Sequence, residues 1–86
     1  MRIRKKATGA LSLPKEIVLD LPLLTAMGRE ELAIENYKSL LSFSETCIRL
    51  HTSVGQLEIT GQRLQLKHIT TEHIIITGAV AAIAWE

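Results

Sequence analysis

The sequence contains little cysteine and no long apolar run, and both absences restrict what the protein can be. Cys47 is the single cysteine, so no intrachain disulfide can form and the fold is predicted not to depend on an oxidising compartment. No stretch of about 18 consecutive apolar residues occurs, and the basic start is not followed by a long apolar core. The sequence therefore predicts neither a membrane-spanning helix nor a signal peptide, and we expect a cytoplasmic protein.

Aromatic residues are also scarce, at 3% of the chain, with one each of phenylalanine, tyrosine and tryptophan. Such a chain has no platform on which nucleic-acid bases could stack, so nucleic acid is not the expected partner. The core must instead be built from the aliphatic residues that dominate the 47% apolar content. Because a chain of 86 residues buries only a modest core, part of its stability is expected to come from a partner.

The residues needed for metal or phosphate binding are few and scattered. Cys47 and His51 are four positions apart in a predicted strand, which separates their Cα atoms by about 13 Å, too far to share one zinc ion. His68 and His73 are the remaining soft ligands. The five glycines occur singly, so no glycine-rich phosphate loop is present. We predict no metal site, no cofactor and no small-molecule substrate.

A cysteine nucleophile is the one catalytic arrangement that the residue types permit. Cys47 could combine with a histidine and with a carboxylate from Glu45, Glu58 or Glu72. The sequence shows no helix N-terminus at Cys47 that would activate its thiol, and no loop that would form an oxyanion hole. We therefore predict no catalytic residues and expect that the protein is not an enzyme.

The sequence does contain the alternation typical of β-strands. Between residues 46 and 78, apolar residues recur at every second position in four pairs: Ile48 and Leu50, Leu57 and Ile59, Leu64 and Leu66, and Ile74 and Ile76. Two segments follow the pattern Leu/Ile-x-Ile-Thr-Gly and end at Gly61 and Gly78. We interpret both glycines as turns between strands.

This alternation predicts an all-β fold of about seven or eight short antiparallel strands, with residues 13–86 as a single domain. Strands are expected over residues 23–27, 31–35, 40–43, 46–52, 57–60, 63–69, 73–77 and 79–85, and the first two are expected to form a hairpin at Gly28-Arg29. The last segment is rich in alanine, but its β-branched residues favour a strand over a helix. We expect a small meander, roll or barrel-like domain, with solenoid-like stacking of strand pairs as a variant.

Positive charge is concentrated at the N-terminus, although the net charge of the whole chain is only +1. Four basic residues lie within the first six: Arg2, Arg4, Lys5 and Lys6. We predict that residues 1–12 form a flexible basic arm. This arm suggests an alternative function, as a peripheral membrane or nucleic-acid-binding module in which the four basic side chains contact an anionic surface.

Two apolar segments, residues 74–76 and 80–85, offer more apolar surface than a small domain readily covers. The candidate interface residues are Ile75, Val80, Ile83 and Trp85, with Trp85 as an anchor and Ile83 on the same face of the strand. Short strands also leave open edges whose backbone groups can pair with another chain. We predict a homo-oligomer; the alternative is that these residues form the buried centre of a monomeric barrel or sandwich.

A series of short segments within residues 11–86 matches one known pattern in both order and spacing. The segments are Leu13-Pro14-Lys15-Glu16, Leu19-Asp20-Leu21-Pro22, Leu24-Thr25, Gly28, Leu32-Ala33-Ile34-Glu35-Asn36, Ile48-Arg49-Leu50-His51-Thr52, Gly55-Gln56-Leu57-Glu58-Ile59-Thr60-Gly61, Leu64, Leu66, Ile69 and Ile74-Ile75-Ile76-Thr77-Gly78. Together they resemble the YabP/YqfC family of sporulation proteins from endospore-forming bacteria, and most closely its YqfC branch.

The resemblance implies a small soluble protein made in the mother cell during spore formation. We expect it in the cytoplasm, with a position peripheral to the forespore membrane as a variant. It implies a role in spore envelope or coat development and a membrane-associated sporulation protein as a partner. It transfers no catalytic residue. We therefore expect a non-catalytic structural or adaptor protein of endospore formation that acts through self-association and protein–protein contacts.

Overall fold

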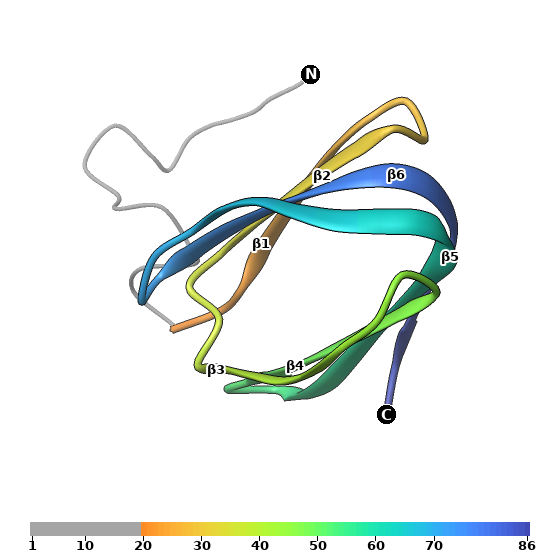
Figure 1. The fold of residues 1–86 in the computed structure, drawn as a ribbon. Helices are drawn as coiled ribbons and strands as arrows, with labels where there is room; N and C mark the ends of the chain where they lie inside the picture. Colours follow the sequence, from red (N-terminus) through yellow and green to blue (C-terminus); the bar gives the residue numbers. More distant parts are fainter. Residues whose placement is uncertain (1–19) are drawn as a thin grey trace, which may run out of the picture.

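The computed structural model describes residues 20–86, in which six strands form one antiparallel sheet (Figure 1). The strands are β1 (Leu23–Met27), β2 (Glu31–Glu35), β3 (Ser39–Phe43), β4 (Cys47–Thr52), β5 (Gly55–Ile69) and β6 (His73–Trp85). Their order across the sheet is β1-β2-β6-β5-β4-β3. The all-β prediction is confirmed, whereas the predicted arm, residues 1–12, lies outside the described residues.

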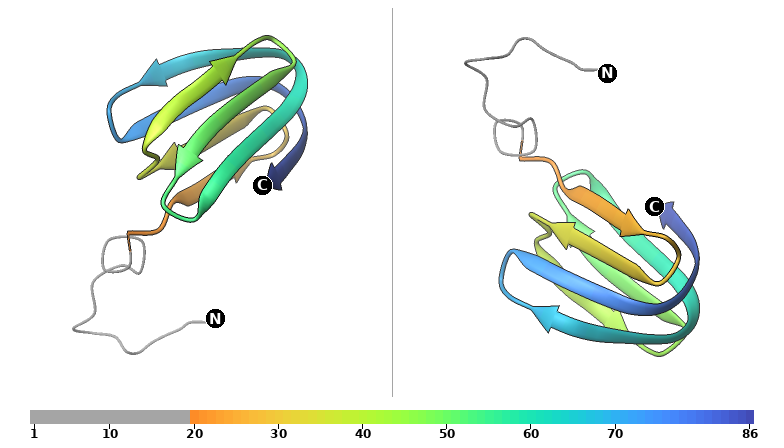
Figure 2. Two further views of the ribbon diagram at one scale, coloured as in Figure 1. Left: turned by 90° about the horizontal axis from the view of Figure 1, so that it is seen from below. Right: turned by 90° about the horizontal axis from the view of Figure 1, so that it is seen from above.

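β5 and β6 are much longer than the other strands and run through both halves of the sheet. β2 pairs with β6 only from His73 to Thr77, and β4 pairs with β5 only from Gly55 to Thr60. The long β5–β6 ribbon curves between these two regions, so the half that contains β1 and β2 folds over the half that contains β3 and β4 (Figures 1 and 2). The sheet stays open, because β1 and β3 end it without pairing to each other.

Two glycines allow the ribbon to bend. At Gly78, φ is +130° and a Cβ atom would lie 2.5 Å from the carbonyl oxygen of Arg63. At Gly61, a Cβ atom would lie 2.1 Å from the carbonyl oxygen of Ala79. Both distances are too short for any side chain, so β5 and β6 can approach this closely only because glycine has none. The pairing of the two strands also shifts register in this region.

The prediction that Gly61 and Gly78 are turns between short strands is therefore wrong. Each glycine lies inside a long strand, so residues 20–86 form six strands rather than seven or eight, and this part of the chain forms an open sheet, neither a barrel nor a solenoid. A glycine between two alternating runs fits a turn and a bend equally, because both require a residue without a side chain. The hairpin at Gly28-Arg29 is confirmed, with φ of +61° at Gly28 and antiparallel pairing of β1 with β2.

The core lies between the two halves of the folded sheet. Its buried apolar side chains come from β2, β4, β5, β6 and the β2–β3 connection: Leu32, Ile34, Tyr37, Ile48, Leu50, Leu57, Ile59, Leu64, Ile74 and Ile76. Seven of the eight alternating positions predicted to be apolar strand cores are fully buried. The eighth, Leu66, is half-buried and packs against this cluster. Burial of each such side chain stabilises the fold by about 1.5–3 kcal/mol.

The connection between β2 and β3 carries the chain from one half to the other. The Asn36 N–H donates to the Glu72 carbonyl at 2.7 Å, and the Lys38 N–H donates to the His51 carbonyl at 2.8 Å. Between them, Tyr37 is buried, and its hydroxyl donates to a backbone carbonyl in the β5–β6 turn. Burial raises the pKa of this hydroxyl. These contacts fix the two halves to each other at one end of the molecule.

Candidate interaction surface

The second half of β6, from Ala81 to Trp85, is an open edge of the sheet. β2 pairs with β6 no further than Thr77, and the turn between β1 and β2 then contacts β6 as far as Val80. The Val80 N–H donates to the Arg29 carbonyl at 2.9 Å, and the Arg29 Nε–H donates to the Val80 carbonyl at 3.5 Å. Within residues 20–86, no strand pairs with the outer side of β6 beyond this point.

The register with β5 determines which backbone groups point outward. Gln56 and Glu86 exchange two backbone hydrogen bonds, at 3.2 and 2.8 Å. Because such pairs alternate along an antiparallel ladder, Ala84 also bonds to β5, while the N–H and C=O groups of Ile83 and Trp85 point away from it. This edge can therefore accept a further strand.

Ile83 and Trp85 are the large apolar side chains of this edge, and they lie on the core side of the sheet. Ile83 is opposite Ile59 and Trp85 is opposite Leu57, and both opposing residues are fully buried. However, Ile83 is 41% exposed and Trp85 is 49% exposed. The reason is that β1 and β2 diverge from this end of β6 (Figure 2), which leaves the core side of the sheet uncovered here.

A hollow of about 360 Å³ lies where β6 leaves the β1–β2 hairpin. Ala26, Arg29 and Leu32 line it on the hairpin side, and Val80 and Ile83 line it on the β6 side. Leu32 belongs to the core and Val80 packs against the core, so the hollow leads from the surface to the core. Its lining suits an apolar side chain from another molecule.

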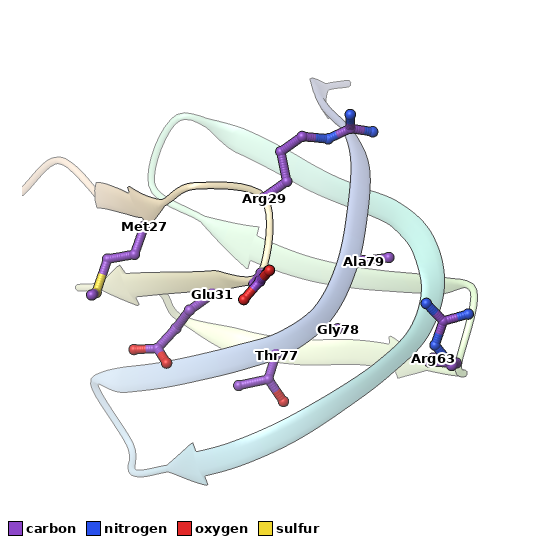
Figure 3. A pocket seen from close by; sticks show the side chains of 8 residues that line it. Met27, Arg29, Glu31, Arg63, Thr77, Gly78 and Ala79 are labelled. Carbon is purple, nitrogen blue, oxygen red and sulfur yellow. The ribbon is translucent and has the colours of Figure 1, made fainter.

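A broader depression of about 810 Å³ lies beside the same turn (Figure 3). Arg29 and Glu31 of the hairpin, Arg63 of β5 and residues 77–79 of β6 line it. Figure 3 shows the Arg29 and Arg63 side chains at separate places along this depression. The Glu31 carboxylate pairs with Lys67 at 3.6 Å. The two guanidinium groups therefore do not form a joint site for one anion.

The structure brings together three of the four residues predicted as an interface. Val80, Ile83 and Trp85 follow one another along the second half of β6, whereas Ile75 is half-buried in the first half, opposite Ala33 of β2. Sequence reasoning misses Arg29, which contacts Val80 from 51 positions away. A residue in a predicted turn carries no sign of the distant strand that it meets.

Cys47, Arg49 and His51 share the outer face of β4. The Cys47 Sγ atom lies 3.7 Å from a carboxylate oxygen of Glu58, but the same oxygen accepts a hydrogen bond from Arg49 Nε at 3.0 Å. The hydrogen bond to Glu58 raises the pKa of Arg49. Of the three carboxylates considered for a cysteine nucleophile, that of Glu58 is therefore engaged by a guanidinium group.

The remaining predicted site residues do not form a cluster in the described part of the chain. His68 and His73 lie edge to face near the β5–β6 turn, with their ring centroids 5.8 Å apart. Within residues 20–86, no three His, Cys, Asp or Glu side chains are grouped so that they could hold a metal ion. The same residues include no helix long and apolar enough to cross a membrane. The four basic residues predicted to contact an anionic surface lie outside the described range: Arg2, Arg4, Lys5 and Lys6.

Comparison with known proteins identifies the family of this chain. The sequence profile of the YabP family matches residues 22–86, which include all six strands. An uncharacterized protein of Bacillus subtilis (strain 168), YqfC, is 36% identical over 84 residues, which cover 98% of this chain and 90% of the relative. These matches confirm the resemblance indicated by the ordered motifs. The chain therefore belongs to the YabP family, a family of sporulation proteins.

Proposed function

We propose that this chain is a non-catalytic structural or adaptor protein of endospore formation, which acts in spore envelope or coat development by binding other proteins, including copies of itself. The open edge of β6 is the observation that carries this proposal. It combines outward backbone groups with two large apolar side chains, Ile83 and Trp85, that are about half exposed. Membership of a family of sporulation proteins supports the biological setting.

Both features of the edge favour protein partners. Outward N–H and C=O groups gain hydrogen bonds from an added strand, and each large apolar side chain contributes up to about 1.5–3 kcal/mol when it is fully buried.

We further propose that the protein works in the cytoplasm of the mother cell, peripheral to the forespore membrane, with a membrane-associated sporulation protein as a second partner.

Self-association is tested by light scattering of the full chain over a range of concentrations, with electron micrographs of the same samples. We expect a mass above the 9.6 kDa of one chain, rising with concentration. Trp85→Ala should shift the mass toward the monomer, because it removes the largest exposed side chain of the edge. Leu41→Ala is the matched control: Leu41 is 50% exposed but belongs to β3, at the far side of the sheet.

Sporulating cells of the host organism provide the second readout for the same variants. Cells without the protein should form spores with a defective envelope or coat, and Leu41→Ala should restore them while Trp85→Ala should not. A chain that stays at 9.6 kDa at every concentration would remove self-association from the proposal. Normal spores in cells without the protein would remove the structural role.

A further inference from the structure

We infer that two copies of this chain pair through the Ala81–Trp85 edges of β6, antiparallel and about a two-fold axis at Ile83, with Arg29 of each copy against Glu86 of the other. This inference rests on the proposed self-association and specifies its surface. It makes the second copy of the chain the occupant of the open edge.

The composition of the edge permits this pairing. Residues 81–85 contain no charged residue and no proline, which are the usual devices that keep a strand edge from pairing. Both Ile83 and Trp85 present an N–H and a C=O away from β5. An edge that offers donors and acceptors in alternation is complementary to itself when a second copy runs antiparallel.

Three features of the molecule favour a register centred on Ile83. Arg29 occupies the backbone groups of Val80, and Ala81 is an extra residue of β6 with no partner in β5, so the free edge runs from Ala81 to Trp85 with Ile83 in its middle. In this register Ile83 exchanges two hydrogen bonds with its own copy. The Trp85 ring is placed opposite the small Ala81 of the second copy, next to the apolar hollow that Ala81 also lines.

The same register brings opposite charges together. Its last pair is Trp85 of the second copy with Ala81, so Glu86 of the second copy follows next to Arg29, which contacts Val80 through its backbone carbonyl and its Nε atom. Within residues 20–86, neither Arg29 nor Glu86 forms a close ion pair. The Glu86 carboxylate accepts a hydrogen bond from Gln56 at 3.2 Å, and its charge contributes to the raised pKa of Arg49. The two-fold axis creates two such Arg29–Glu86 pairs. A shift of register by one residue would separate them.

Exchange of these charges tests the register. Sedimentation of the full chain should show that Arg29→Glu and Glu86→Arg each raise the dimer dissociation constant roughly tenfold, since each variant sets like charges together twice. The double variant, Arg29→Glu with Glu86→Arg, should return the constant to within about threefold of the wild-type value. Glu30→Gln is the control for an exposed charge of the same turn and should leave the constant unchanged.

Ile83→Pro tests the backbone pairing separately. The Ile83 N–H points away from β5, so proline removes a donor that the fold does not use. We expect this variant to be monomeric, while Ile83→Ala, which keeps the N–H, weakens the dimer without abolishing it. Far-ultraviolet circular dichroism shows whether each variant keeps the sheet. If Ile83→Pro does not fold, the charge exchange still decides the question.

The outcomes separate this inference from the proposed function. Oligomers that survive Ile83→Pro, or a double charge variant that binds no better than the single ones, would overturn the inferred surface and leave self-association intact. A wild-type chain that never associates would overturn both. Recovery of the dimer in the double variant, together with its loss in Ile83→Pro, would establish the pairing.

Discussion

Asp20 shows at the scale of single residues how the start of the described chain is held. Its carboxylate pairs with the Lys38 ammonium at 2.9 Å and accepts a hydrogen bond from the Asn36 side chain at 3.1 Å. Its backbone carbonyl accepts a hydrogen bond from the Ser53 hydroxyl. These contacts tie residue 20 to the β2–β3 connection and to the β4–β5 turn. The carboxylate is exposed, so its contribution to stability is small and screened by salt.

The pKa of Asp20 gives a prediction about pH. The hydrogen bonds from Lys38 and Asn36 lower this pKa below its usual value of 3.8. A lowered pKa in the folded state means that Asp20 stabilises the fold above pH 3.8, and that this contribution is lost as the pH falls through the lower folded-state value. At neutral pH, Asp20→Asn should therefore unfold at a lower urea concentration than the wild type.

The difference between Asp20→Asn and the wild type should close in acid, once Asp20 is protonated in both folded and unfolded chains. Urea unfolding at several pH values, followed by circular dichroism, measures it. Glu30→Gln serves as the control, because the Glu30 carboxylate has no ion pair within residues 20–86. A difference that stays constant down to acid pH would show that the carboxylate charge is not the cause.

At the scale of elements, the bend of the β5–β6 ribbon depends on two residues without side chains. Gly78→Ala places a Cβ atom 2.5 Å from the Arg63 carbonyl oxygen at a φ of +130°. We predict that it lowers the free energy of unfolding by about 2–4 kcal/mol, because backbone rather than a flexible side chain must move. Urea unfolding of the full chain measures the change.

Gly28→Ala is the matched control for this prediction. Gly28 also has a positive φ, +61°, but a Cβ atom there has nothing within 4 Å. The expected cost is only the roughly 1 kcal/mol of placing alanine in the left-handed region. If the two variants lose the same stability, the close approach of β5 and β6 does not determine the bend.

The elements also show how far the sequence can predict this fold. Ile48 and Leu50 alternate with polar residues and are buried, so β4 and its faces follow from period two alone. Gly61 and Gly78 cannot be assigned in this way, because the distinction between a turn and a bend depends on what lies across from the glycine. Only the tertiary structure shows this neighbour, which is the Arg63 carbonyl for Gly78 and the Ala79 carbonyl for Gly61.

The candidate interaction surface can likewise be predicted only in part from the sequence. The apolar character of Ile83 and Trp85 is visible in the sequence, and it indicates a surface or a core without deciding between them. Their exposure depends on β2, which stops pairing at Thr77 and turns away, and no local pattern in residues 79–85 records this. For the same reason Arg29 is a turn residue in the sequence and the end of an open edge in the structure.

For the whole molecule, Trp85 provides an internal reporter of association. It is the single tryptophan and is 49% exposed in one chain. If β6 pairs with its copy, we predict that the emission maximum moves to shorter wavelength as the concentration rises, in parallel with the mass. Ile83→Pro should keep the long-wavelength emission at all concentrations. An increase in mass without a change in emission would place Trp85 outside the contact.

The order of the strands also has a consequence for how the chain reaches its native state. Four of the five strand pairings join consecutive strands, and only the pairing of β2 with β6 links distant segments, as between Glu31 and Thr77. Short loops close quickly, so the β3–β6 meander can form while the β1–β2 hairpin is still detached. Docking of this hairpin then becomes the late step of folding. Until it occurs, the edge of β6 that faces away from β5 lacks β2, whose Ile34 and Leu32 lie opposite Ile74 and Ile76.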